Sequence, residues 1–300
     1  MEGKVLICDP VDNVLIEKLK SKFNVEYQPE INRDKLLSII NDYNVVVVRS
    51  RTKIDRDIID RGKNLKIIAR AGIGVDNIDT DYAEAKNIKI VYAPGSSTES
   101  VVEITLAMMV MGARDLVKGI ENTRKNDFTK LKGFELAGKT LGILGYGRIG
   151  HAIADAARAF NMNFIAYDPY PVEYQDFVKK VTLEDLLKNS DVLSINVTMR
   201  KDSPYILNDP ELSMLKKGVI IVNTSRANAI NGRDMLKYLR DGTIKSFVSD
   251  VFWHEPARED YEFEMLKMPN VLITPHLGAQ SAEAQKRIAI MTAENILKEW

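Results

Sequence analysis

The chain has 300 residues, and its 42 lysine and arginine residues are balanced by 42 aspartate and glutamate residues. This balance argues against a global field that attracts nucleic acid or an anionic membrane, and no apolar run approaches the roughly 18 residues of a membrane span. The start "MEGKVLICDPVDN" lacks the pattern of a signal peptide, and a single cysteine, Cys8, excludes an internal disulfide and a thiolate metal cluster. We therefore expect a cytoplasmic protein without a metal.

The first 95 residues alternate short β-branched runs with segments of helical periodicity. Strands are expected at residues 4–9, 23–27, 45–50, 65–72 and 88–94, and helices at residues 11–22, 33–43 and 55–62. Because strands separated by helices form parallel βαβ units, this part of the chain predicts a parallel sheet.

A second series of strands follows a long amphipathic segment, which predicts a helix from about residue 98 to residue 117. Further strands are expected at residues 140–146, 163–168, 191–197, 218–225, 245–251 and 270–276, and a final helix at residues 281–300. Two strand series broken by one long helix predict an α/β protein with two doubly wound parallel-sheet domains.

The segment "TLGILGYGRIGHAIADAARAF" carries glycines in GxGxxG spacing between a predicted strand and a predicted helix. In that setting Gly145 allows a tight turn, Gly147 lets a pyrophosphate approach the backbone, and Gly150 lets helix and strand pack closely. Asp168 ends the next predicted strand, where a carboxylate can accept the ribose hydroxyls of an adenosine. No arginine follows it, so the segment predicts a site for NAD in preference to NADP.

A second glycine pair occurs in "RAGIGVDNID", also after a predicted strand. Asn77 stands where a third glycine would be, and no acidic strand end follows at the right distance. We therefore reject this segment as a second dinucleotide loop, although its amides could receive a small anion at the edge of a parallel sheet.

Hydride transfer at a carbinol carbon needs a group that exchanges the hydroxyl proton and a cation that holds the carboxylate. Of the three histidines, His151 follows the glycine loop, where a surface or packing role is expected, and His254 lies in an irregular stretch before a proline and has no evident partner. His276 ends a predicted strand, and Arg226 and Glu255 follow two other strand ends. Because these ends share the ligand-binding edge of a parallel sheet, their convergence indicates a catalytic group.

The segments "LGILGYGRIG", "YDPY", "VNTSR", "DVFWHEP" and "TPHLGA", in this order and spacing, resemble the signature segments of the D-isomer-specific 2-hydroxy acid dehydrogenases. The resemblance spans the chain, and "VVVVRSRTKI" and "RAGIGVDNID" look most like the 3-phosphoglycerate dehydrogenases. It implies NAD-dependent oxidation of a D-2-hydroxy acid. The expected reaction is that of 3-phosphoglycerate to 3-phosphohydroxypyruvate in serine biosynthesis.

The resemblance also implies roles for individual residues. His276 would be the acid/base, Glu255 would hydrogen-bond its other ring nitrogen and favour the protonated imidazole, and Arg226 would hold the 2-oxo acid. Asp250 matches the position that contacts the nicotinamide carboxamide. The remaining cofactor-binding positions implied by the resemblance are Ile73, Arg148, Ile149, Val197, Thr224, Ser225, Gly278 and Ala279, together with His276.

In this family the NAD domain is inserted into a smaller domain. The resemblance thus implies a flavodoxin-like substrate domain of residues 1–95 and 277–300, a Rossmann NAD domain of residues 96–276, and a substrate cleft between them. The implied substrate-binding positions are Arg49, Ser50, Arg70, Gly72, Ile73, Gly74, Arg226 and His276. Arg51 and Lys53 join Arg49 and Arg70 in a group of cations that suits a phosphorylated acid.

Some positions depart from the family pattern. Residues 197–199 stand where Pro-Leu is usual, Ala227 and Asn228 replace usual glycines, and Asn231 stands where an aspartate is common. The chain ends at Trp300, so we expect no carboxy-terminal regulatory domain and no serine feedback through one.

Two other functions stay open at this point. A hydroxypyruvate or glyoxylate reductase or a D-lactate dehydrogenase would share every catalytic residue named above. A non-enzymatic NAD-sensing module of the corepressor kind would share the fold. The family also suggests a homodimer formed through the dinucleotide domain.

Overall fold

The computed structural model describes residues 3–199 and 203–300. The chain forms two compact units: unit 1 comprises Met1–Ser97 and Ala279–Trp300, and unit 2 comprises Thr98–Gly278. The two boundaries between the units follow residues 97 and 278, each two residues after the boundary expected from the sequence. Within the described residues, no helix is both long and apolar enough to cross a membrane.

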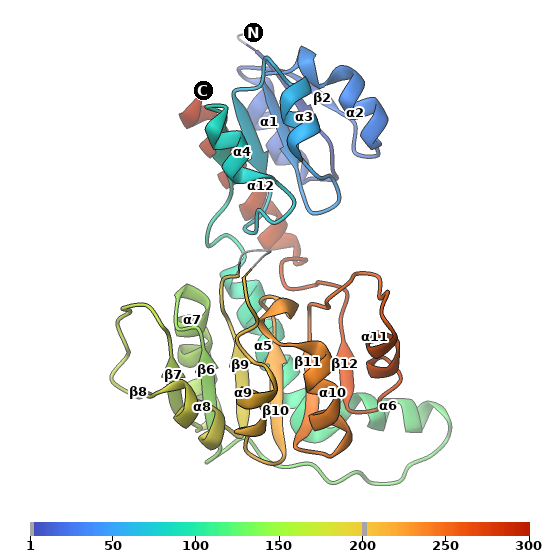
Figure 1. The fold of residues 1–300 in the computed structure, drawn as a ribbon, viewed down its shortest axis with the longest axis vertical. Coiled ribbons are helices and arrows are strands. Elements are labelled where there is room, and N and C mark those ends of the chain that lie inside the picture. Colours follow the sequence, from blue (N-terminus) through green and yellow to red (C-terminus); the bar gives the residue numbers. More distant parts are fainter. Residues whose placement is uncertain (1–2, 200–202) are drawn as a thin grey trace. The chain divides into compact units, whose positions relative to one another are not determined.

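Unit 1 contains a five-stranded parallel sheet (Figure 1). Its strands are β1 (Lys4–Ile7), β2 (Asn24–Tyr27), β3 (Val45–Val48), β4 (Ile67–Arg70) and β5 (Lys89–Val91). They are arranged in the order β2-β1-β3-β4-β5, which is the flavodoxin-like order. The expected parallel sheet is confirmed.

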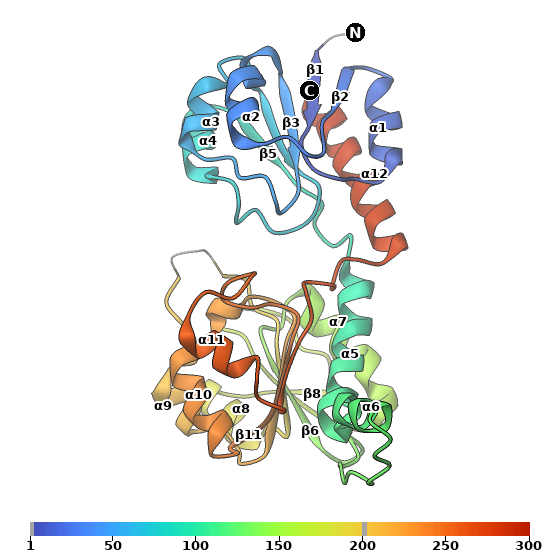
Figure 2. The same ribbon diagram turned by 90° about the vertical axis from the view of Figure 1, so that its right-hand side faces the viewer.

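The helices of unit 1 cover both faces of this sheet. They are α1 (Asn13–Lys20), α2 (Arg33–Ile39), α3 (Arg56–Arg61), α4 (Thr80–Ala85) and α12 (Ala282–Glu299), with a short 3-10 turn η1 (Ile40–Asp42). Helices α1 and α12 pack on one face and α2, α3 and α4 on the other (Figure 2). Because both faces are covered, the four valines of β3 are fully buried.

Unit 2 contains a seven-stranded parallel sheet in the order β12-β11-β10-β9-β6-β7-β8. The strands are β6 (Thr140–Leu144), β7 (Asn163–Tyr167), β8 (Val178–Lys180), β9 (Val192–Ile195), β10 (Val219–Asn223), β11 (Ile244–Ser249) and β12 (Val271–Ile273). The order reverses between β6 and β9, and such a switch point is where doubly wound sheets bind ligands. The expected Rossmann-type sheet is confirmed.

The helices of unit 2 also form two layers. They are α5 (Thr98–Arg114), α6 (Leu116–Arg124), α7 (Arg148–Ala157), α8 (Leu183–Asn189), α9 (Asp209–Ser213), α10 (Gly232–Arg240) and α11 (Asp260–Met265), with 3-10 turns η2 (Arg158–Phe160) and η3 (Ala227–Ala229). Helices α5 and α7 cover one face, and α8 to α11 cover the other (Figure 2). Along β10 alternate residues enter the two cores, and the strand ends at Asn223.

The structure differs from the sequence-based expectation in several details, and helices α4, α8, α9, α10 and α11 were not predicted. The helix predicted over residues 98–117 breaks at Asp115, whose φ of 50° is left-handed, and α6 starts a new direction. Strand β8 was not anticipated, because two of its three residues are exposed lysines. Charged residues on a short edge strand are typical, since they discourage pairing with another sheet.

Candidate active site

The glycine loop between β6 and α7 is shaped by close backbone approaches. Gly145 has a φ of 88°, and a Cβ there would lie 2.7 Å from the carbonyl oxygen of Asn196, in the segment after β9. A Cβ on Gly150 would lie 2.4 Å from the carbonyl oxygen of Gly145, so only glycine lets α7 approach the loop. At Gly147, by contrast, a Cβ would meet no atom of the protein within 4 Å.

The open space at Gly147 lies at the start of α7. Gly147 is the residue before the first turn and offers no side chain to cap the helix, and Arg148 beside it is exposed. Free amides and the positive end of a helix dipole bind phosphates. The loop therefore fits the pyrophosphate of a dinucleotide.

Asp168 follows β7 and contacts the glycine loop directly. Its Oδ2 accepts a hydrogen bond from the amide of Tyr146 at 2.8 Å, and its Oδ1 accepts one from the amide of Tyr170 at 2.9 Å. A carboxylate has about four acceptor positions, so two remain for ribose hydroxyls. The structure thus brings the predicted ribose carboxylate against the predicted phosphate loop.

Below this loop lies an aromatic stack. The ring of Tyr146 lies 4.1 Å from that of His151 and 4.9 Å from that of Tyr174. The Tyr146 hydroxyl donates to Gln175, which in turn donates to Asp155 on α7. The half-buried ring of His151 therefore packs against that of Tyr146 in the glycine loop.

The loop after β10 carries Arg226 and is organised by a buried amide. Asn223 is fully buried; its side-chain oxygen accepts from the amide and hydroxyl of Ser225 at 3.0 Å each, and its Nδ2 donates to the Arg226 carbonyl. The Thr224 hydroxyl lies 3.0 Å from that of Thr105 on α5. Sequence reasoning missed Asn223, although its place at the strand end, three residues before Arg226, was the available signal.

His276 lies in a tight segment after β12, which a buried carboxylate holds. Asp250, 2 % exposed, accepts hydrogen bonds from the Thr274 hydroxyl and from the amides of Leu277 and Gly278 at 2.5–2.6 Å. Within this segment His276 has a left-handed φ of 57°. Asp250 therefore fixes the backbone around His276, with about one acceptor position left for a cofactor amide.

The side chains of His276 and Glu255 face each other, with Nδ1 of His276 lying 3.5 Å from Oε2 of Glu255. The second oxygen of Glu255 accepts from the amide of Phe252 at 3.0 Å. Burial alone would raise the pKa of the Glu255 carboxyl, but His276, the Phe252 amide and the charge of Arg226 outweigh it and lower that pKa. Glu255 is therefore an anion at neutral pH, suited to hold a protonated imidazole.

In unit 1, Asp9 organises the loop after β3. Its buried carboxylate accepts from the amides of Arg49 and Thr52 and from the Thr52 hydroxyl. Arg51 pairs with Asp9 at 3.0 Å and donates to the carbonyls of Cys8, Pro29 and Ile31. These contacts of Arg51 hold the loop together.

Other residues expected at the substrate lie around the same loop. Arg49 is half-buried, and burial lowers the pKa of its guanidinium while the charge of Asp9 opposes that shift. Ser50 and Lys53 are exposed.

Arg70 and Gly72 form a coupled pair at the end of β4. A Cβ on Gly72 would lie 1.2 Å from Nη1 of Arg70, so the guanidinium of Arg70 occupies the space of the missing side chain. Ile73 and Gly74 follow in the same half-buried loop. Ala279 belongs to unit 1 and packs against its core, whereas Val197 packs against a core of unit 2.

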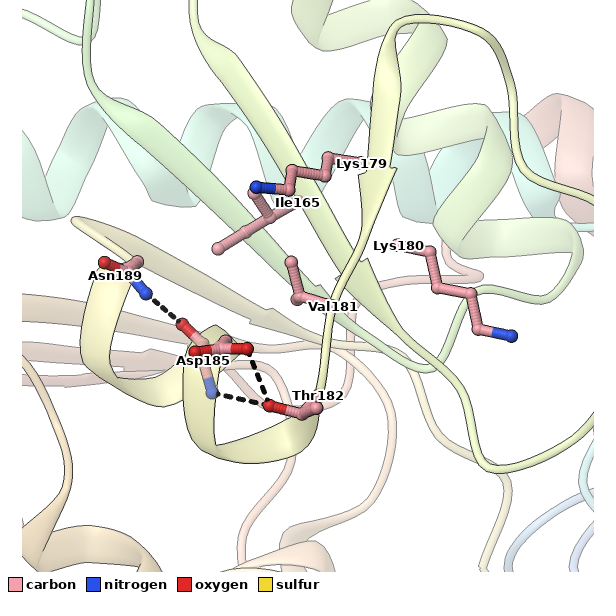
Figure 3. Close-up of a pocket in the computed structure, with 7 residues that line it drawn as sticks. All are labelled: Ile165, Lys179, Lys180, Val181, Thr182, Asp185 and Asn189. Atoms are coloured by element: carbon pink, nitrogen blue, oxygen red, sulfur yellow. Dashed lines mark hydrogen bonds between the residues drawn. The ribbon is translucent and has the colours of Figure 1, made fainter.

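A shallow pocket at the edge strand β8 contains none of these residues. It is lined by Ile165, Lys179, Lys180, Val181, Thr182, Asp185 and Asn189 (Figure 3). The two lysines leave the strand in opposite directions. At the start of α8 the Thr182 hydroxyl accepts a hydrogen bond from the amide of Asp185 and donates one to the Asp185 carboxylate. This pocket is a feature of the sheet edge and not of the candidate site.

A glycine cradle for a dinucleotide and a carboxylate-supported histidine, each following the carboxyl end of a strand of the same parallel sheet, place the chain among the dinucleotide-dependent dehydrogenases. Residues 106–278 match the family model described as D-isomer specific 2-hydroxyacid dehydrogenase, NAD binding domain. The match covers more than half of the chain, and the chain belongs to this family. Its NAD-binding domain lies in unit 2.

Relatives cover the whole chain. It is 41 % identical over 299 residues to a hydroxypyruvate reductase of Thermotoga maritima, covering 99 % of this chain and 98 % of that protein. It is 37 % identical over 301 residues to a D-3-phosphoglycerate dehydrogenase of Methanocaldococcus jannaschii, covering 98 % of this chain but 57 % of that protein. The structure of a glyoxylate reductase from Paecilomyes thermophila superimposes with a TM-score of 0.89 at 29 % identity, covering 98 % and 94 % of the two chains.

Proposed function

We propose that the protein interconverts a D-2-hydroxy acid and its 2-oxo acid with NAD, and that His276 exchanges the proton of the substrate hydroxyl. The observation that carries this proposal is the 3.5 Å contact between His276 Nδ1 and Glu255 Oε2, in a unit that also holds the glycine cradle. When bound, NAD supplies the acceptor of the hydride.

The remaining roles follow from charge and position. With Nδ1 facing Glu255, the Nε2 atom of His276 is left to face the substrate oxygen. We propose that Arg226 binds the carboxylate of the 2-oxo acid and polarises its carbonyl, and that Arg49 and Arg70 add positive charge for substrate binding. Unit 1 would thus add Arg49 and Arg70 to the substrate site, whereas unit 2 would supply Arg226, His276 and the cofactor site.

For the substrate we propose a three-carbon acid of the glycerate type, with hydroxypyruvate reduced to D-glycerate. Two of the relatives described above are named for substrates with this three-carbon skeleton: the Thermotoga protein for hydroxypyruvate and the Methanocaldococcus protein for 3-phosphoglycerate. The commitment of Arg51 to Asp9 and three carbonyls removes one of the four cations expected for a phosphate. This favours an unphosphorylated acid.

The second candidate is the oxidation of 3-phosphoglycerate in serine biosynthesis. It is supported by the half-buried Arg49 and the exposed Lys53 in the loop after β3, which leave positive charge without the aid of Arg51.

The deciding experiment compares kcat/KM for hydroxypyruvate and 3-phosphohydroxypyruvate with NADH, and for D-glycerate and 3-phosphoglycerate with NAD. Glyoxylate and pyruvate complete the panel. We expect hydroxypyruvate to be preferred at least about tenfold over its phosphate, because a phosphate without a dedicated arginine gains little from binding. A preference for the phosphorylated pair would establish the second candidate instead.

His276→Ala tests whether the protein is an enzyme at all. Loss of the acid/base lowers turnover at least ~100-fold, while the Kd of NAD stays within about threefold because the glycine cradle is untouched. Unchanged turnover would overturn the role of His276. No turnover by the unaltered protein on the whole panel, with NAD still bound, would instead support the NAD-sensing module.

We further propose a homodimer formed through unit 2 and a cytoplasmic location. Helix α6 buries none of its own residues, and Leu116, Ile120 and Phe128 in and after it are exposed by 43 %, 52 % and 74 %. Exposed apolar groups of this kind favour a subunit contact. Sedimentation of the protein and of Ile120→Asp measures whether this surface pairs.

A further inference from the structure

His254 precedes Glu255 and has a buried partner that the sequence did not reveal. Its Nδ1 lies 3.0 Å from Oε1 of Glu262, the third residue of α11. The Glu262 side chain is fully buried, whereas that of His254 is 40 % exposed. A buried carboxylate with such a partner is costly to leave unpaired, so the contact constrains where His254 lies.

The other oxygen of Glu262 holds the far end of the same loop. Its Oε2 accepts hydrogen bonds from the amides of Arg258 at 2.7 Å and Glu259 at 2.9 Å. One carboxylate therefore fixes both ends of the segment 254–259, and Glu255 lies between the two fixed points. We call this arrangement the Glu262 clamp.

The clamp does more than begin a helix. Its bonds to Arg258 and Glu259 belong to the first turn of α11, where a capping glutamate is common. The contact with His254 lies outside the helix and serves no cap. It connects α11 to the residue directly before Glu255, and the carboxylate of Glu255 itself contacts the Phe252 amide and His276.

We propose that Glu262 is a positioning residue, which holds the loop 254–259 so that Glu255 stays within reach of His276. His254 transmits this constraint from α11 to Glu255 through one peptide bond. The role rests on the proposed function, because it matters to turnover only if Glu255 and His276 perform the proton exchange.

The test is Glu262→Gln, which keeps the shape of the side chain and removes its charge. Its matched control is Glu264→Gln, two residues along the same helix, where the carboxylate is an exposed partner of Arg240. We expect Glu262→Gln to lower kcat about tenfold, with the KM of NAD within about twofold, because a displaced Glu255 weakens proton transfer and leaves the cradle intact. The control keeps its kcat.

A second measurement does not need turnover. The chain has three histidines, so the ring signals of His276 can be assigned by NMR from single substitutions. Glu262→Gln should displace the His276 signals from their positions in the unaltered protein, and Glu264→Gln should not. A displaced signal without any activity in the unaltered protein would uphold the positioning role and reject the proposed reaction.

Other outcomes overturn the proposal. Unchanged kcat and unchanged His276 signals in folded Glu262→Gln would show that the clamp does not reach Glu255, and a lower melting temperature with unmoved signals would leave it a helix cap only. If Glu262→Gln does not fold, His254→Gln replaces it, since that side chain is partly exposed. His276 signals that stay in place in this variant would overturn the proposal equally.

Discussion

Three buried carboxylates hold the loops that carry the candidate site residues. Asp9 holds the loop with Arg49, Asp250 holds the segment with His276, and Glu262 holds the ends of the loop with Glu255. Each carboxylate accepts hydrogen bonds from two backbone amides, so it fixes the chain itself and not only a side chain. At this scale the geometry of the site depends on buried carboxylates that hold the backbone, and two of them, Asp9 and Glu262, have no assigned contact with substrate or cofactor.

Gly72→Ala is predicted to act through Arg70. The new methyl group would occupy the position of the Arg70 guanidinium, which must then move. If Arg70 binds the substrate, the KM of the substrate should rise about tenfold in this variant. The Kd of NAD should stay unchanged because the glycine cradle lies in the other unit. Steady-state kinetics and NAD titration measure both.

A double-mutant cycle separates this effect from backbone strain at Gly72. In an Arg70→Ala background, Gly72→Ala should raise the KM little further, because the group that it displaces is already absent. Additive effects of the two substitutions would show that Gly72 acts independently of Arg70.

The stability contributed by Glu262 should depend on pH. Burial alone would raise the pKa of this carboxyl, but the amides of Arg258 and Glu259 and the contact with His254 outweigh it, so its pKa lies below the ordinary value of 4.5. A group whose pKa is lowered in the fold stabilises it above the ordinary value, and the contribution is lost as the pH falls through the lowered pKa.

Glu262→Gln should therefore reduce the free energy of unfolding by about 2 kcal/mol at neutral pH, and by progressively less below pH 4.5. Chemical denaturation across this pH range, followed through unit 2, measures the difference. A gap that stays constant down to pH 3 (roughly one and a half units under the ordinary value) would contradict the assignment.

At the scale of elements, the strands that carry the site were predictable and their loops were not. The buried runs before Gly145, Arg226 and His276 are β-branched and lie at parallel strand ends, so the sequence predicts that these residues share one edge. The partners of His254 and the role of Asn223 depend on loop conformations, which periodicity does not encode. Glu262 was missed because the short helix α11 was itself not predicted.

The glycine cradle provides a prediction at this scale. Gly147→Ala introduces a methyl group that meets no protein atom, so the melting temperature should not change. If a pyrophosphate approaches this position, the Kd of NAD should nevertheless rise at least ~10-fold, because the methyl group takes its space. Gly119→Ala on α6, where a Cβ lies 3.9 Å from Leu131, is the control. Equal NAD affinity in both variants would place the cofactor elsewhere.

At the scale of the whole molecule, unit 1 is built from two segments of chain that lie far apart in sequence. Helix α12 supplies Ile288, Ala289, Ala293 and Ile296 to its core and packs beside α1. Lys18 pairs with Glu294 across 276 positions of sequence. One face of the unit 1 sheet is therefore only partly covered, by α1, unless α12 is present.

A chain that stops at residue 278 should show this dependence. Unit 1 would expose apolar surface worth several kcal/mol, roughly 1.5–3 kcal/mol for each large buried side chain, and should unfold. Unit 2 keeps all of its strands and should bind NAD within about threefold of the full chain. Limited proteolysis and NAD titration check the two halves of this prediction, and a protease-resistant unit 1 would contradict it.

The split construction of unit 1 also bears on how the protein is made. The ribosome synthesises β1 to β5 first and α12 only after all of unit 2, an interval on the order of ten to forty seconds at ordinary elongation rates. During that time unit 2 can fold alone, while one apolar face of the nascent sheet of unit 1 stays only partly covered, by α1. The protein should therefore need chaperones more during its synthesis than during refolding of the complete chain. The chaperones should bind its first 97 residues.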